Sequence, residues 1–186
     1  MTAVAVLVST VACSTLAPAP VEQPDEGFLV QGRLAIRGAD DGFSSNFRWQ
    51  HEPRRFSIEL WGPLGQGRSR LEGDEDRVVL QTADGAVYTE SDTGAAVKRW
   101  LGIDVPVAAL AFWIQGESAP SARAHRQDRD AAGDLVRLEQ LAWTLDFSAY
   151  GAHATGRRLP GRIIARHGDV KVTLLPKSWT FALETP

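Results

Sequence analysis

The chain contains few residues that could crosslink it or bind a metal. Cys13 is the only cysteine and has no partner for an intramolecular disulfide. The 4 histidines are scattered and offer no pair at metal-ligand spacing. We therefore expect neither a disulfide scaffold nor a zinc module, and no bound metal.

Positive charge is not in excess either. The sequence of 186 residues has 20 Lys and Arg against 23 Asp and Glu, a formal net charge of -3. Nucleic-acid binding needs a positive field that this balance does not supply. The phosphate-binding pattern G-x-x-x-x-G-K-[ST] does not occur, and the lysines are Lys98, Lys171 and Lys177. We therefore expect no nucleic-acid partner, no nucleotide-driven work and no cofactor.

No apolar run is long enough to span a bilayer. The longest, residues 3–13, is interrupted by Ser9 and Thr10. As a helix it would be about 16 Å long, about half the hydrocarbon thickness. The body of the protein is therefore predicted not to be transmembrane.

The N-terminus has the pattern of an exported, lipid-anchored protein. Residues 1–12 are mostly apolar without an acidic residue, as in a secretory signal, and Cys13 stands where a bacterial lipoprotein carries its acylated cysteine. Residues 14–26 contain three prolines and no hydrophobic periodicity. We expect residues 1–12 to be a signal peptide and 13–27 a lipidated cysteine with a Pro-rich tether. The alternative is an apolar N-terminus with one incidental buried cysteine, since Thr10 stands where such signals favour leucine.

From Phe28 onward, apolar and polar residues alternate in short segments separated by Gly, Pro and Asp. This period of two predicts half-buried strands in an antiparallel meander. The predicted strands are 28–36, 43–49, 56–60, 69–71, 78–81, 86–88, 143–147, 163–166 and 170–174. Helical spacing predicts two short helices, 92–101 and 107–115, and residues 121–133 are predicted to be a charged loop.

These elements predict one domain over residues 28–186, mainly β with short helices. The apolar face of the meander must be buried, and the two helices and the curl of the sheet are the covers available. We expect a curved antiparallel sheet that forms an incomplete barrel around an apolar cavity, with the helices in its mouth. The 6 tryptophans suit the lining of such a cavity. The alternative is that they simply fill the core.

Catalytic motifs are missing from the sequence. No G-x-S-x-G pattern occurs, and residues 42–46 (GFSSN) do not fit it. The acidic residues of 74–76 and the pair Asp128 and Asp130 lie in polar segments, where solvated turn residues are the expected interpretation. We predict no catalytic residue.

Residues 61–67 (WGPLGQG) form the most unusual local feature. Pro63 and the glycines predict a tight turn between two strands. Leu64 then stands near the tip with little chain to cover it. A single exposed leucine is also common on protein surfaces and by itself predicts no function.

A set of short motifs, in this order along the chain, resembles the LolB family of outer-membrane lipoproteins. The motifs are GRLAI (32–36), SNFRWQ (45–50), GPLG (62–65), Pro106-Val107, Leu110, Trp113–Gly116, Trp143, Tyr150, Leu159-Pro160 and Trp179. Each motif is weak by itself, and their order is fairly specific. The resemblance covers nearly all of the chain after Cys13.

The resemblance implies a function in lipoprotein sorting. Proteins of this family accept acylated lipoproteins from the periplasmic carrier LolA and insert them into the inner leaflet of the outer membrane. It implies that Cys13 anchors the protein to the periplasmic face of that membrane and that Leu64 takes part in membrane insertion. The implied partners are a LolA-like carrier, lipoprotein acyl chains and outer-membrane phospholipid. We expect the protein to be a monomer.

Such a function needs an apolar site, because acyl chains exposed to water would cost about 30 kcal/mol for tens of methylenes. Inward-facing strand positions would supply the site: Phe47, Trp49, Ile58, Leu60, Leu145 and Phe147. Because the chain has no ATP motif, each transfer must run downhill or nearly level. The site must therefore hold acyl chains more tightly than the donor and less tightly than a bilayer.

Two other functions remain open from sequence. The first is an enzyme that acts on lipid or glycan in the same barrel, with Asp128 or a buried carboxylate as acid or base. The second is a structural envelope lipoprotein that holds a protein partner at the sheet edge and binds no lipid. Turnover assays and copurified lipid would distinguish these functions from the first.

Overall fold

The computed structural model describes residues 27–38, 42–74 and 77–181. The predicted signal peptide, Cys13 and nearly all of the tether lie outside these residues. The elements are β1 (Phe28–Arg37), β2 (Gly42–His51), β3 (Arg55–Trp61), β4 (Ser69–Asp74), β5 (Val78–Gln81), β6 (Val87–Glu90), α1 (Thr93–Leu101), α2 (Val107–Trp113), β7 (Arg126–Arg129), β8 (Leu135–Gln140), β9 (Trp143–Ser148), β10 (Gly151–Ala152), β11 (Arg158–Leu159), β12 (Arg162–His167) and β13 (Val170–Phe181).

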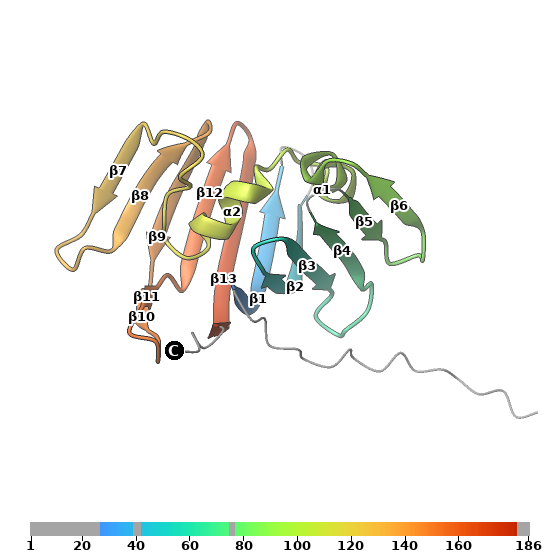
Figure 1. The fold of residues 1–186 in the computed structure, drawn as a ribbon, viewed down its shortest axis with the longest axis horizontal. Coiled ribbons are helices and arrows are strands. Elements are labelled where there is room, and N and C mark those ends of the chain that lie inside the picture. The colour runs from blue at the N-terminus through green and yellow to red at the C-terminus, as the bar shows by residue number, and fades with distance from the viewer. Residues whose placement is uncertain (1–26, 39–41, 75–76, 182–186) are drawn as a thin grey trace, which may run out of the picture.

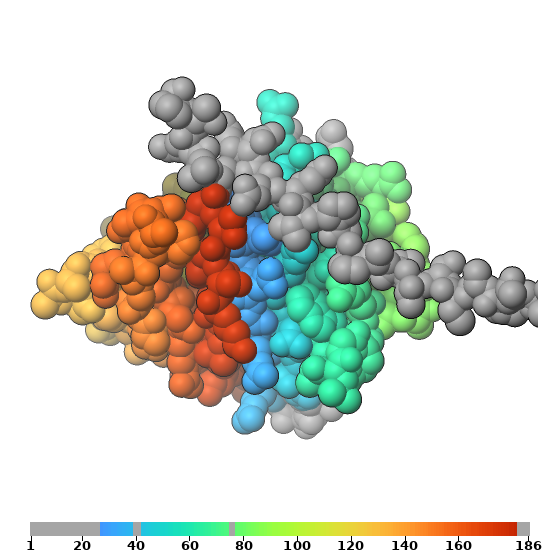
Figure 2. All heavy atoms as spheres, turned by 90° about the horizontal axis from the view of Figure 1, so that it is seen from below, coloured from blue at the N-terminus to red at the C-terminus, as the bar shows by residue number. Residues whose placement is uncertain are grey.

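Most strands belong to one antiparallel sheet in the order β6-β5-β4-β3-β2-β1-β13-β12-β9-β8-β7, and β10 and β11 pair separately. The first and last strands meet in the middle, where Phe28 lies opposite Phe181. Figure 2 shows the red strand β13 directly beside the blue strand β1. The sheet curves without closing, and both helices lie on its concave side (Figure 1). The predicted incomplete antiparallel barrel with short helices is confirmed.

The alternating residues of the central strands form the core. In β1, Val30, Leu34 and Ile36 are buried while Gln31 and Arg33 are exposed. Successive side chains of a strand point to opposite faces, so this period of two gives the sheet one apolar face. The apolar face is the concave one that the helices cover.

Both predicted helices are present, α1 beginning one residue after the predicted start and α2 ending two residues before the predicted end. Asp92 is the N-cap of α1, and its Oδ1 accepts a hydrogen bond from Ala95 N at 2.8 Å. Gly102 ends α1 with a left-handed φ of 70°. Pro106 precedes α2, and Gly116 stops the turn that follows with a φ of 78°. Within the described residues, no helix is long and apolar enough to cross a membrane.

The prediction of a loop over residues 121–133 is wrong in part, and β8 was not predicted. Residues Arg126–Arg129 form β7, a strand at one edge of the sheet. All four of these residues are polar, so no alternation marks the strand. Polar side chains on an edge strand discourage pairing with another chain, which accounts for a strand without an apolar face.

β13 is also longer than the predicted 170–174, and it runs through Pro176 to Phe181. The register with β1 shifts between Gln31 and Gly32, which lie opposite Ser178 and Pro176. The extra residue makes a bulge, and a bulge tolerates a proline that cannot donate to the ladder. Pairing with β12 ends at Leu174, so Pro176 leaves no donor missing on that side.

Candidate functional site

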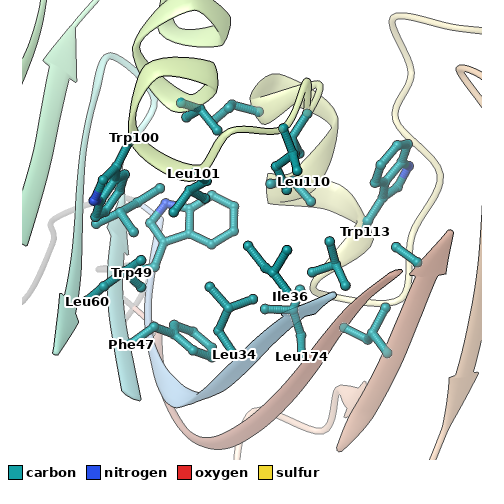
Figure 3. Close-up of a pocket in the computed structure, with 18 of the residues that line it drawn as sticks. Leu34, Ile36, Phe47, Trp49, Leu60, Trp100, Leu101, Leu110, Trp113 and Leu174 are labelled. Atoms are coloured by element: carbon teal, nitrogen blue, oxygen red, sulfur yellow. The ribbon is translucent and has the colours of Figure 1, made fainter. Parts of the chain in front are cut away.

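An apolar cavity lies between the concave face of the sheet and the two helices (Figure 3). All of its lining residues have apolar or tryptophan side chains. They are Leu34, Ile36, Phe47, Trp49, Ile58, Leu60, Val97, Trp100, Leu101, Ile103, Val105, Val107, Leu110, Trp113, Trp143, Leu145, Ile163, Ala165, Val172 and Leu174. The cavity spans both halves of the sheet, because the list includes residues of β1, β2 and β3 and also of β9, β12 and β13.

Five of the six residues predicted from the sequence lie in this lining: Phe47, Trp49, Ile58, Leu60 and Leu145. The sixth, Phe147, is buried with 4% of its surface exposed but is not among the lining residues.

Sequence reasoning did not place the helical part of the lining. Trp100, Leu101, Leu110 and Trp113 come from α1 and α2 and cover the sheet residues from above (Figure 3). The helical spacing of apolar residues from 107 onward was a usable signal, because it marks the face that α2 turns to the sheet.

The cavity is small in this structure, with a volume of about 80 Å³. An engineered apolar cavity of about 150 Å³ holds one benzene. The space between the helices and the sheet is therefore too small for a whole acyl chain. A guest of that size requires one or both of the helices that cover the cavity to move away from the sheet.

A buried hydrogen-bond network fastens α2 and the segment after it to the sheet. Gln140, at the end of β8, accepts from Trp113 Nε1 at 2.8 Å and from Ala119 N at 2.9 Å. Its Nε2 donates to the carbonyl oxygens of Ala119 and Ala122 at 2.8 and 2.6 Å. We call these four residues the Gln140 network. The network was not predicted, because Gln140 ends a strand of mixed apolar and charged residues and its partners lie 18 to 27 residues away in the sequence.

Leu64 lies at the tip of the β3–β4 loop with 92% of its surface exposed. The loop is held by its own hydrogen bonds: Gly62 N to Gln66 O at 2.8 Å, Gly65 N to Gly62 O at 2.9 Å and Leu64 N to Gln66 Oε1 at 2.9 Å. Gly65 has a φ of 83°, which favours glycine. The predicted tight turn is confirmed, and its leucine makes no part of the core.

The base of this loop is tied to neighbouring strands. Ser45 Oγ of β2 donates to Trp61 O at 2.9 Å. The Arg68 guanidinium lies 5.1 Å from the Trp61 ring centroid and contacts Glu59 Oε2 at 2.8 Å. These contacts present Leu64 at the end of a supported loop.

The candidate carboxylates lie away from the cavity lining. Asp128 pairs with Arg126 at 2.7 Å on the edge strand β7. Asp130 Oδ1 accepts from the backbone N–H groups of Ala132 and Asp134, which makes it a turn residue. Asp134 is buried and bound to Arg158, with Nη2 2.7 Å from Oδ2.

Among the described residues, no group of three or more His, Cys, Asp or Glu side chains is placed to hold a metal ion.

Two titratable groups have pKa values shifted by burial. Desolvation lowers the pKa of His51, which lies against Phe28 with a ring-centroid distance of 5.2 Å. Burial also raises the pKa of Tyr150, whose hydroxyl donates to Leu135 O at 2.7 Å. Neither residue lines the cavity, so both pKa shifts result from the packing of these side chains and not from the candidate site.

Comparison with known proteins gives a consistent result. A family model described as "Outer membrane lipoprotein LolB" matches residues 26–179. The "Outer-membrane lipoprotein LolB" of Stutzerimonas stutzeri is 35% identical over 154 residues, covering 83% of this chain and 74% of the relative. The protein of the same name from Alkalilimnicola ehrlichii is 32% identical over 184 residues, covering 92% of this chain and 91% of the relative.

The fold also resembles a solved structure. A putative outer membrane lipoprotein-sorting protein domain from Vibrio parahaemolyticus matches with a TM-score of 0.51 and 9% identity, covering 89% of each chain. At this identity the match describes the fold alone.

Proposed function

Because this chain belongs to the LolB family of outer-membrane lipoproteins and acts in lipoprotein localisation, we propose that the cavity under α1 and α2 binds the acyl chains of its cargo. The observation that carries the proposal is the composition of the lining, in which twenty apolar or tryptophan side chains from both halves of the sheet, the two helices and the segment between the helices surround one space. Replacing water by such a lining favours hydrocarbon by about 0.8 kcal/mol per methylene.

The organisation of the chain follows from this role. Residues 1–12 are a signal peptide, Cys13 is the lipidated first residue of the mature protein, and residues 13–27 tether the domain of residues 28–186 to the outer membrane. A LolA-like periplasmic carrier supplies the cargo, and phospholipid of the inner leaflet receives it. The protein works as a monomer.

The protein is a binding and transfer factor and not an enzyme. Asp128, the acid or base of the enzymatic alternative, is ion-paired on an edge strand, and the lining of the cavity contains no carboxylate. A turnover assay with lipid and glycan substrates, run beside an acyl-binding assay, distinguishes the two functions. Turnover would contradict the proposal.

A charge placed in the lining tests the acyl site. Ile58→Glu puts a carboxylate against hydrocarbon, which costs several kcal/mol, so binding of a fluorescent acyl probe should fall at least tenfold. Ser57→Glu is the matched control, because Ser57 is the preceding residue of β3 and faces the other side of the sheet. It should bind the probe as wild type does. Folded Ile58→Glu protein with unchanged probe binding would contradict the proposed site.

We propose a separate role for Leu64, which inserts into the bilayer during delivery. Leu64→Glu should leave the free energy of unfolding within about 0.5 kcal/mol, because the side chain is exposed. It should accept lipoprotein from the carrier normally and fail to pass it to liposomes, since a charge opposes insertion by about 2 to 3 kcal/mol. Leu64→Ala should be intermediate.

A two-step assay that scores acceptance and delivery separately measures this difference. Val87→Glu is the matched control, because Val87 is another exposed apolar residue, 62% exposed on the edge strand β6. It should deliver normally. If Leu64→Glu blocks acceptance, or delivers at the wild-type rate, the insertion role is wrong.

A further inference from the structure

One tryptophan of the cavity lining, Trp49, has a buried indole N–H without a hydrogen-bond partner in the part of the chain that the structure describes. Trp49 on β2 is 5% exposed, and its Nε1 is buried without an acceptor among the described residues. By contrast, Nε1 of Trp113 in the same lining donates to Gln140 Oε1 at 2.8 Å. Buried donors nearly always have a partner in native structures, so an unpaired one at a ligand cavity needs an explanation, and an acceptor on the guest supplies one.

Packing holds the Trp49 ring in place. Its centroid lies 5.4 Å from that of Phe28 at an interplanar angle of 73°, and 6.1 Å from that of His51. In the ladder, Trp49 pairs with Ile58 on one side and with Val30 on the other. Figure 3 shows the indole lying in the middle of the labelled lining side chains, below Leu101. The donor therefore belongs to a ring that packing holds at the cavity.

The chemistry of the guest supplies the matching acceptor. The methylenes of an acyl chain accept no hydrogen bond, but every acyl chain ends in a carbonyl group, whether it is linked as an ester or as an amide. We propose that Trp49 Nε1 donates a hydrogen bond to this carbonyl oxygen. The inference rests on the proposed function, because it assumes that the cavity binds acyl chains.

This hydrogen bond makes the site a receptor for acyl linkages and not for hydrocarbon in general. Burial of the chain alone gives affinity without orientation, because the hydrophobic effect is non-directional. One donor at a fixed position sets how far the chain enters before its carbonyl is paired. It also discriminates against chains that lack the carbonyl, because these leave the indole N–H unpaired.

Two ligands that differ only in the carbonyl test the proposal. Monopalmitoylglycerol carries an ester, and its ether analogue O-hexadecylglycerol has the same chain and headgroup without the carbonyl oxygen. Both are titrated against a fluorescent acyl probe on the full chain. Wild type should prefer the ester by about three- to tenfold, as expected for one neutral hydrogen bond. Trp49→Phe keeps an aromatic ring without the donor and should bind the two ligands equally.

The matched control is Trp100→Phe, which removes an indole N–H from another lining residue. It should retain the preference for the ester. A second measurement uses the wild-type protein and does not depend on ligand binding by a variant. The NMR signal of the Trp49 indole proton is assigned by its loss in Trp49→Phe. This signal should move downfield with the ester and not with the ether.

The outcomes distinguish the two proposals. If wild type binds ester and ether equally and the indole signal does not move, the hydrogen bond is refuted and acyl binding stands. If wild type binds neither ligand, the acyl site itself is refuted and the hydrogen bond with it.

Discussion

The two helices that cover the cavity are secured in different ways. α2 is fastened from inside, through the Gln140 network between Trp113 and the end of β8. α1 is fastened at its surface: Asp92 caps its N-terminus and Arg99 pairs with Glu90 of β6 at 2.8 Å. It packs on β5 and β6, at the far edge of the sheet from β7 and β8.

Because the proposed acyl guest requires α1 or α2 to move away from the sheet, this difference predicts which of the two helices moves. Exposed ion pairs contribute little to stability, typically below about 1 kcal/mol, whereas breaking a buried network leaves several polar groups unpaired. The cavity of about 80 Å³ must enlarge to take an acyl chain. We expect α1 to move away from the sheet while α2 stays in place.

Replacing Gln140, the centre of the Gln140 network, should have the largest effect on the free energy of unfolding. Gln140→Leu leaves Trp113 Nε1, Ala119 N and Ala122 O without the partner that Gln140 supplies, and leaves Ala119 O with only its 3.4 Å hydrogen bond from Ala122 N, so the free energy of unfolding should fall by about 3 to 5 kcal/mol. Urea denaturation measures the change. Gln127→Leu, at an exposed glutamine bound to Ser118 Oγ, should stay within about 0.5 kcal/mol of wild type. If Gln140→Leu and Gln127→Leu lowered the free energy of unfolding equally, the Gln140 network would not fasten α2 more firmly than α1 is fastened.

The second largest effect on the free energy of unfolding should come from Trp113 of α2, and the matching change at Trp100 of α1 should cost less. Trp113→Phe loses the hydrogen bond to Gln140 and leaves unfilled volume at a side chain that is 1% exposed, for a loss of about 2 to 3 kcal/mol. Trp100→Phe, at a half-buried residue of α1, should lose less than about 1 kcal/mol. The same urea experiment compares them, and a larger loss at Trp100 would reverse our assignment of the fixed helix.

Loss of the α1 cap should have a smaller effect. Asp92→Ala removes the acceptor for Ala95 N and should cost about 1 kcal/mol. Because α1 is the part expected to move, hydrogen exchange in residues 93–101 should rise more than in α2. Asp104→Ala, at an exposed residue 3.9 Å from Lys98, is the control and should change neither quantity. Faster exchange in α2 than in α1 would contradict the comparison.

The smallest of the expected effects is that of salt on the contribution of the Arg99–Glu90 ion pair to the free energy of unfolding. The Arg99–Glu90 pair is partly exposed, so raising NaCl to about 1 M should change its contribution by less than about 0.5 kcal/mol. The difference in unfolding free energy between wild type and Arg99→Ala should shrink with salt. The difference between wild type and Gln140→Leu should not, because the network is neutral and buried. A salt-dependent Gln140 effect would show that the network is open to solvent.

Residues with a repeating pattern were predictable from the sequence. The alternation in β1, β2, β3 and β9 gave the strands and five of the six predicted lining residues, because each face of a strand repeats every two residues. Helical spacing predicted residues 92–101, within one residue of α1, because one face of a helix repeats every three to four residues.

Features that depend on one residue or on a distant partner were not predictable. β7 has no apolar face, and β13 continues beyond the predicted 174 through Pro176, which the bulge opposite Gly32 accommodates. Gln140 reaches Ala119 and Trp113 only after folding, at separations of 21 and 27 residues. The unpaired Nε1 of Trp49 has no sequence signal, because any tryptophan carries the same donor.

The pairing of β1 with β13 also has a consequence for the order of folding. Each half of the sheet is built largely from neighbouring hairpins, but the halves join through residues as distant as Phe28 and Phe181. Closing so long a loop is entropically costly and slows folding. We therefore expect the two meanders to form first and the β1–β13 seam last. Since the cavity takes its walls from both meanders, the proposed acyl site should form only in this last step.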